Sequence, residues 1–161
     1  MNMENTSVKI KSLLQHGYRY ALSMTHNTAQ AEELLKDAWA AILQAHGTLE
    51  KRYLFSAIRM RFINTRKRDR HVPMGPLETH KMENLEDDSY FAADNDALAD
   101  SLATLRPVER EAIYLSAVEG YTAEEIANHT NQPRGTILSL IHRSRKKLRQ
   151  YFERDIKEVG L

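Results

Sequence analysis

The spacing of the apolar residues constrains the fold of this chain more than any other feature. In both halves these residues recur every three or four positions, as along one face of an α-helix, and nowhere do they alternate as in a half-buried β-strand. We therefore expect an all-α protein, with a helix capped at Asn27 or Thr28 and ended by a left-handed residue at Gly47. Pro107 suits the first turn of a later helix, where its missing N–H is not needed. The apolar residues expected to face the core are Ile10, Leu13, Leu14, Tyr18, Ala21, Leu22, Ala31, Leu34, Leu35, Ala38, Trp39, Ile42, Leu43, Leu54, Ala57, Ile58 and Phe62 in the first half, and Leu98, Leu102, Leu105, Ile113, Leu115 and Val118 in the second.

The periodicity disappears between residues 71 and 95. Pro73, Gly75 and Pro76 oppose helix formation there, and the rest of the segment is acidic with few apolar residues. We expect a flexible acidic linker over 71–95 that joins two small helical domains, at residues 1–70 and 96–161.

The charges are sorted along the chain, although the formal net charge is only +1. Between residues 51 and 70 the charged side chains are all basic except Asp69, and between 134 and 149 they are all basic. Between residues 71 and 100, in contrast, the charged side chains are all acidic except Lys81. This order suggests two contacts with a polyanion and a connector that avoids it.

Several classes of function are disfavoured by what the sequence lacks. There is no cysteine, so disulfides and thiolate chemistry are excluded. The seven histidines show no metal-ligand spacing, and no glycine-rich phosphate loop or nucleophile elbow occurs. We expect no enzyme, no metal, no cofactor and no small-molecule substrate. With no apolar run long enough to cross a bilayer, we also expect no membrane insertion and a cytoplasmic location.

Residues 122–143 have the layout of a helix-turn-helix, which we expect in the C-terminal domain. Thr122 and Glu125 form a capping-box pattern, and Ala127 is small enough for a close helix crossing. Asn131 tolerates the positive φ that a tight turn needs, and Ile137 anchors the second helix. The leading turns of such a helix meet base edges, and later basic residues meet phosphates. The predicted base-edge contacts are Arg134, Thr136 and Ser139, and the predicted phosphate contacts are His142, Arg143, Arg145, Lys146 and Lys147.

The same half of the chain resembles region 4 of bacterial sigma factors of the extracytoplasmic-function type. The resemblance rests on residues 105–115, on 119–127, on Gly-Thr-Ile at 135–137, and on the Arg-x-Arg-x-x-Leu run that begins at Arg143. It implies binding to the −35 element of promoters.

The first half is similar to region 2 of the same family. Residues 18–22 and 31–39 resemble its first two helices, which contact the polymerase clamp, and residues 53–70 resemble the helix that recognises and melts the −10 element. The implied partners are core RNA polymerase, promoter DNA and an anti-sigma factor. Carried over by position, the polymerase-binding residues are Glu32, Glu33, Lys36 and Asp37, and the −10-binding residues are Arg59, Arg61, Asn64, Lys67 and Arg68.

Departures from the family pattern leave alternatives open. Leu140 stands where the family usually has Arg, and Leu138 where it often has a polar residue. Leu140 either joins Ile137 and Ile141 in the core, which we favour, or forms an apolar contact with Leu138 for a protein partner. Besides a promoter-directing sigma factor, the sequence allows a sigma-like decoy that sequesters an anti-sigma factor. It also allows a transcription regulator of the response-regulator type.

Overall fold

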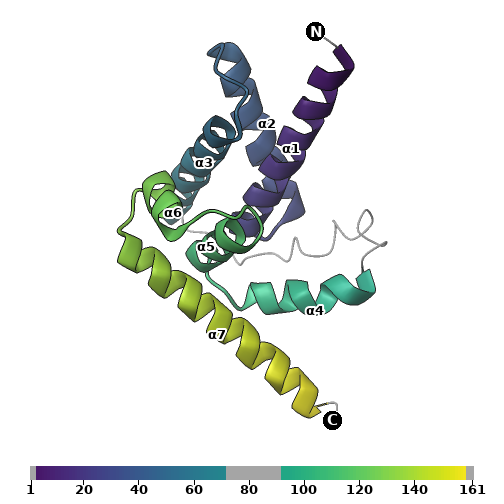
Figure 1. Cartoon of the computed structure of the whole chain (residues 1–161), viewed down its shortest axis with the longest axis vertical. Coiled ribbons are helices and arrows are strands. Elements are labelled where there is room, and N and C mark those ends of the chain that lie inside the picture. The colour runs from purple at the N-terminus through teal and green to yellow at the C-terminus, as the bar shows by residue number, and fades with distance from the viewer. Residues whose placement is uncertain (1–2, 72–91, 159–161) are drawn as a thin grey trace. The chain divides into compact units, whose positions relative to one another are not determined.

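The computed structural model describes residues 3–71 and 92–158, and all seven elements in these ranges are α-helices (Figure 1). This confirms the predicted all-α class for the described residues. The helices are α1 (Met3–Thr25), α2 (Thr28–Gln44), α3 (Lys51–His71), α4 (Ala92–Ala103), α5 (Pro107–Ala117), α6 (Ala123–Thr130) and α7 (Arg134–Glu158).

The helices separate into two compact units, α1–α3 and α4–α7. The predicted linker falls mainly on residues 72–91, which lie outside the described residues. At its two margins, His71 ends α3 and residues 92–95 open α4. The domain limits and the flexibility of the linker stay predictions.

In the first unit, α1, α2 and α3 each pack against the other two and form a three-helix bundle. At its centre the rings of Tyr20 and Phe55 stack, with centroids 4.4 Å apart. Gly17 marks the closest approach of α1 to its neighbours: a Cβ atom there would lie 2.8 Å from Leu54 Cδ2 and 2.9 Å from Leu35 Cδ1. The absence of a side chain at Gly17 therefore allows this tight packing.

The most deeply buried row of α1 coincides only in part with the predicted one. Of the predicted set only Ala21 is fully buried, whereas Gly17, Tyr20 and Met24 complete the buried row. The helix is rotated so that Gly17 faces its neighbours, which leaves Leu14 and Tyr18 at the margin of the core. Leu43 on α2 is exposed and was also predicted wrongly.

The ends of α2 show one correct and one wrong prediction. Asn27 caps the N-terminus, since its Oδ1 accepts a hydrogen bond from the Gln30 N–H at 2.9 Å. At the other end His46, and not Gly47, takes the left-handed conformation, with φ of 51°. The N–H of Gly47 then donates to the Ile42 carbonyl at 2.9 Å, as in a Schellman motif. Histidine tolerates this region better than most residues with a side chain, so glycine was not required.

In the second unit, α5 and α6 both pack on α7, and α4 also contacts α7 (Figure 1). Pro107 is the first residue of α5, as predicted. Leu105 and Leu115 are buried as expected, but Val118 is 60% exposed and Leu98 45% exposed. Val118 is exposed because α5 ends at Ala117, and Leu98 is exposed because α4 has little contact with the rest of its unit. Both were predicted wrongly.

Candidate nucleic-acid interface

Residues 122–143 form the predicted helix-turn-helix, made of α6, a three-residue turn and the first part of α7. The capping box at the start of α6 is present: the Glu125 N–H donates to Thr122 Oγ1 at 3.1 Å, and the Thr122 N–H donates to Glu125 Oε1 at 3.0 Å. Asn131 takes the left-handed conformation, with φ of 54° and ψ of 45°. The Gln132 N–H then closes the turn on the Ala127 carbonyl at 3.0 Å. Capping and turn chemistry thus set the start and the end of α6.

A row of buried residues fixes α7 against the rest of its unit. Ile137, Leu140, Ile141 and Ser144 are buried at helical spacing. The Ser144 hydroxyl contacts two carbonyl oxygens, that of Leu140 at 2.6 Å and that of Glu109 on α5 at 3.1 Å. Leu140 is therefore a core residue, which decides the alternative left open by the sequence.

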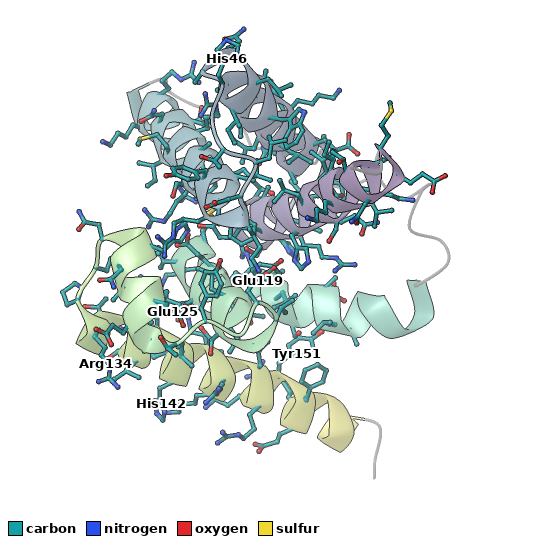
Figure 2. The ribbon with its side chains drawn as sticks, turned by 45° about the horizontal axis from the view of Figure 1, so that its top comes forward. His46, Glu119, Glu125, Arg134, His142 and Tyr151 are labelled. Carbon is teal, nitrogen blue, oxygen red and sulfur yellow. The ribbon has the colours of Figure 1, made fainter. Side chains whose placement is uncertain are left out.

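The opposite side of α7 is exposed and rich in cations. Arg134 and His142 project from the side of α7 that faces away from α5 and α6 (Figure 2). The 3.6-residue period brings Ser139, His142 and Lys146 onto one line along the middle of this side. We call this side the α7 outer face; its exposed residues include Arg134, Thr136, Leu138, Ser139, His142, Arg143, Arg145 and Lys146. Cations and hydroxyls along a helix can contact phosphates and base edges at once.

Lys147 differs from the other predicted phosphate contacts. Its Nζ lies 2.8 Å from Oε1 of Glu109, whose side chain is completely buried on α5. The same oxygen accepts the Arg106 N–H at 2.9 Å. Burial alone would raise the pKa of Glu109, but the hydrogen bonds and positive charges of Lys147 and Arg106 outweigh it and lower the pKa. Lys147 thus ties α7 to α5, a role that sequence analysis missed because the two residues are far apart in the chain.

In the first unit, α3 carries the second predicted DNA-binding set. Asn64, Lys67 and Arg68 are exposed, whereas Arg59 and Arg61 are half-buried. An Nη atom of Arg61 donates to the Ala57 carbonyl one turn earlier, at 3.2 Å. Its guanidinium therefore lies along the helix instead of extending into solvent.

The predicted polymerase-binding residues lie on α2 of the same unit. Glu32, Glu33, Lys36 and Asp37 are all exposed, because Ala31, Leu34 and Ala38 form the buried row of α2.

A pocket of about 270 Å³ lies between α2 and α3. It brings Asp37 of the predicted polymerase-binding set next to Arg61, Asn64 and Arg68 of the predicted DNA-binding set. We did not predict that residues of the two sets line one pocket, because each set was assigned from positions along a single helix. Leu34, Met60 and Thr65 complete the lining.

Within residues 3–71 and 92–158, no cluster of three or more histidine or acidic side chains is placed to hold a metal ion. In the same ranges no helix is long and apolar enough to span a membrane.

Comparison with known proteins identifies a family for part of the second unit and relatives that cover most of the chain. Residues 95–148 match the family described as Sigma-70, region 4. The chain is 31% identical over 127 residues to the RNA polymerase sigma-E factor of Streptomyces antibioticus, covering 76% of this chain and 71% of that protein. It is 29% identical over 157 residues to the ECF RNA polymerase sigma factor SigE of Mycolicibacterium smegmatis, covering 89% of this chain but only 60% of that protein.

A solved structure shares the fold of the chain. It is the sigma factor RpoE in complex with the anti-sigma factor NepR from Bartonella quintana, with a TM-score of 0.69 and 23% sequence identity, covering 94% of this chain and 98% of that one. The helix-turn-helix of α6 and α7 lies within the residues that match region 4, so the second unit is a helix-turn-helix domain of the sigma-70 class. With the similarity to the sigma-E factors, the chain belongs to the extracytoplasmic-function family of RNA polymerase sigma factors.

Proposed function

We propose that this protein directs core RNA polymerase to specific promoters, reading the −35 element with α7 and the −10 element with α3. The observation that carries the proposal is the α7 outer face, which keeps its cations and hydroxyls exposed while Ile137, Leu140 and Ile141 turn inward. A recognition helix presents its residues in this way to the major groove. Membership of the sigma factor family supplies the second argument.

Each surface has its own part in the proposed mechanism. Arg134, Thr136 and Ser139 contact base edges, and Arg143 and Lys146 contact phosphates, so the affinity falls steeply with salt as counterions are released. On the other unit, Asn64, Lys67 and Arg68 of α3 hold the −10 element. The free-energy cost of unstacking the bases of this element is offset by their binding to the protein.

The acidic side of α2 makes the proposed contact with core polymerase. Glu32, Glu33 and Asp37 surround the cationic Lys36 there, and all four are exposed. An anti-sigma factor is the proposed regulator, and the cytoplasm, where core polymerase works, is the proposed location. The protein acts by binding and performs no catalysis of its own.

The test is co-purification with core polymerase in the presence of randomised DNA duplexes, followed by sequencing of the bound DNA. We expect two short motifs at a fixed spacing. A double substitution, Arg143→Ala with Lys146→Ala, removes the upstream motif, whereas Arg154→Ala, which lies further along α7, keeps it. A single palindrome would instead indicate a regulator of the response-regulator type, and the proposal would be wrong.

A further inference from the structure

Leu138 is an apolar side chain on the α7 outer face. It is 44% exposed, although its neighbours Ile137, Leu140 and Ile141 are buried. Leu138 lies one turn from Arg134 and one turn from His142, two residues predicted from the sequence to contact DNA. Leu138 is not part of the buried core of the unit, so its side chain is available to contact a binding partner.

Gly135 supplies an independent observation at the same place. A Cβ atom at Gly135 would meet no atom within 4 Å, and its φ is not in the left-handed region. Neither packing nor backbone conformation therefore requires a glycine there, and in a helix glycine is less favourable than alanine. The bare backbone allows a partner to come close to α7 next to Leu138, because side chains at i and i+3 lie on one face of a helix.

The chemistry of the neighbours limits what this partner is. A surface that docks another protein exposes an apolar patch of several hundred Å². Leu138 instead stands among Arg134, Ser139 and His142, which suit a polyanion. In the major groove, the one apolar group on the base edges is the C5-methyl group of thymine.

We infer that Leu138 is a specificity-determining residue that recognises one thymine of the upstream promoter element through its C5-methyl group. The contact buries the isobutyl group of Leu138 against the methyl group, with Gly135 allowing the close approach. The inference rests on the proposed function, since it requires α7 to bind in the major groove.

The test removes the methyl group from the DNA and the side chain from the protein in separate steps. Duplexes enriched by the full-length chain with core polymerase are remade with uracil in place of thymine, one upstream position at a time. We expect uracil at one position to weaken binding by the wild-type protein about fourfold, which corresponds to about 0.8 kcal/mol for one buried methyl group. Leu138→Ala binds the thymine and uracil duplexes equally.

Val118→Ala is the matched control, because Val118 is an exposed apolar residue at the end of α5 and lies outside the α7 outer face. This variant keeps the preference of the wild-type protein for thymine. The inference is overturned if uracil has no effect at any upstream position, or if it affects Leu138→Ala as much as the wild-type protein. It is equally overturned if Leu138→Ala keeps the preference and loses binding to core polymerase, which would make Leu138 a protein contact. If no duplex is enriched at all, the proposed function itself fails, and the inference fails with it.

Discussion

The ion pair between Glu109 and Lys147 should stabilise the α4–α7 unit, because it joins α5 to α7 through a buried charge. The Glu109 side chain is 0% exposed, and its Oε1 accepts both Lys147 Nζ at 2.8 Å and the Arg106 N–H at 2.9 Å. Its other oxygen, Oε2, is buried and accepts no hydrogen bond from the described residues. Substitution of Lys147 by methionine keeps an unbranched side chain that is one atom shorter and removes its charge. The carboxylate then keeps only Arg106, whose backbone N–H donates to Oε1 at 2.9 Å and whose half-exposed side chain has its Nε 3.5 Å from the same oxygen.

The magnitude follows from the exposure of the two partners. Removal of one partner of a fully buried ion pair costs about 3–5 kcal/mol, and loss of a hydrogen bond to a charged group costs about 1.5–3 kcal/mol. Lys147 is 39% exposed, so water can solvate part of the site and the lower range applies. We expect Lys147→Met to lower the free energy of unfolding of the α4–α7 unit by about 1.5–3 kcal/mol.

The single tryptophan of the chain makes the assay specific to each unit. Trp39 lies on α2, so its fluorescence follows unfolding of the first unit, whereas far-ultraviolet circular dichroism follows the helices of both. In urea, with an m-value of about 1 kcal/mol/M for a domain of this size, the dichroism transition of the α4–α7 unit moves down by about 1.5–3 M. The Trp39 transition stays where it is.

A double substitution provides the control. Glu109→Gln removes the charge and keeps an oxygen that can accept the Arg106 N–H. Combined with Lys147→Met it recovers most of the lost stability, because no buried charge is left unpaired. The ion pair does not stabilise the unit as described if Lys147→Met leaves the dichroism transition in place, or if the double variant is as unstable as Lys147→Met alone.

Three further predictions concern pH, packing and the outer face. The pKa of Glu109 is lowered in the folded protein, so its stabilising contribution is complete above the unfolded pKa of about 4.3 and is lost as the pH falls through the folded pKa. Urea titrations from pH 6 to pH 3 should therefore show a smaller loss of unfolding free energy in Glu109→Gln than in the wild-type protein. Gly17→Ala brings a methyl group to 2.8 Å from Leu54 Cδ2, so the Trp39 transition should report a loss of about 1–3 kcal/mol, and an unchanged midpoint would contradict the packing. Gly135→Ala should raise the stability of the α4–α7 unit by about 0.5–1 kcal/mol and yet weaken DNA binding; equal or tighter binding would show that no partner approaches Gly135.

Local sequence signals predicted the helix ends where the chemistry is local. Asn27 and Thr122 cap their helices as expected, and Asn131 turns left-handed, because each of these features depends on residues within one turn. The left-handed residue after α2 was missed, since His46 and Gly47 both allow it and the choice depends on how the chain leaves the helix. The most deeply buried row of α1 was predicted only in part. The row is set by the approach of α2 and α3 at Gly17, which has no side chain to signal burial, and this approach makes Tyr20 and Met24 more deeply buried than Leu14 and Tyr18.

Much of the candidate site could be predicted from the sequence, because the exposed and buried sides of one helix also depend on local spacing. Once Ile137 is taken as the anchor of α7, the helical period alone puts Ser139 and His142 outside and Leu140 and Ile141 inside. The sequence did not show which side chains from distant parts of the chain form ion pairs. Lys147 was predicted as a phosphate contact on its position in a basic run, and only the fold brings it to Glu109 on another helix.

In the proposed function, two helical units, each with a surface for nucleic acid, act together with core polymerase on one promoter. Run-off transcription with purified core polymerase on a template that holds the enriched motifs tests this most directly. We predict a transcript that starts at a fixed distance from the motifs, requires the added protein, and disappears with the Arg143→Ala, Lys146→Ala variant. A protein that binds an anti-sigma factor and gives no promoter-dependent transcript would be a decoy, and the central claim would be wrong.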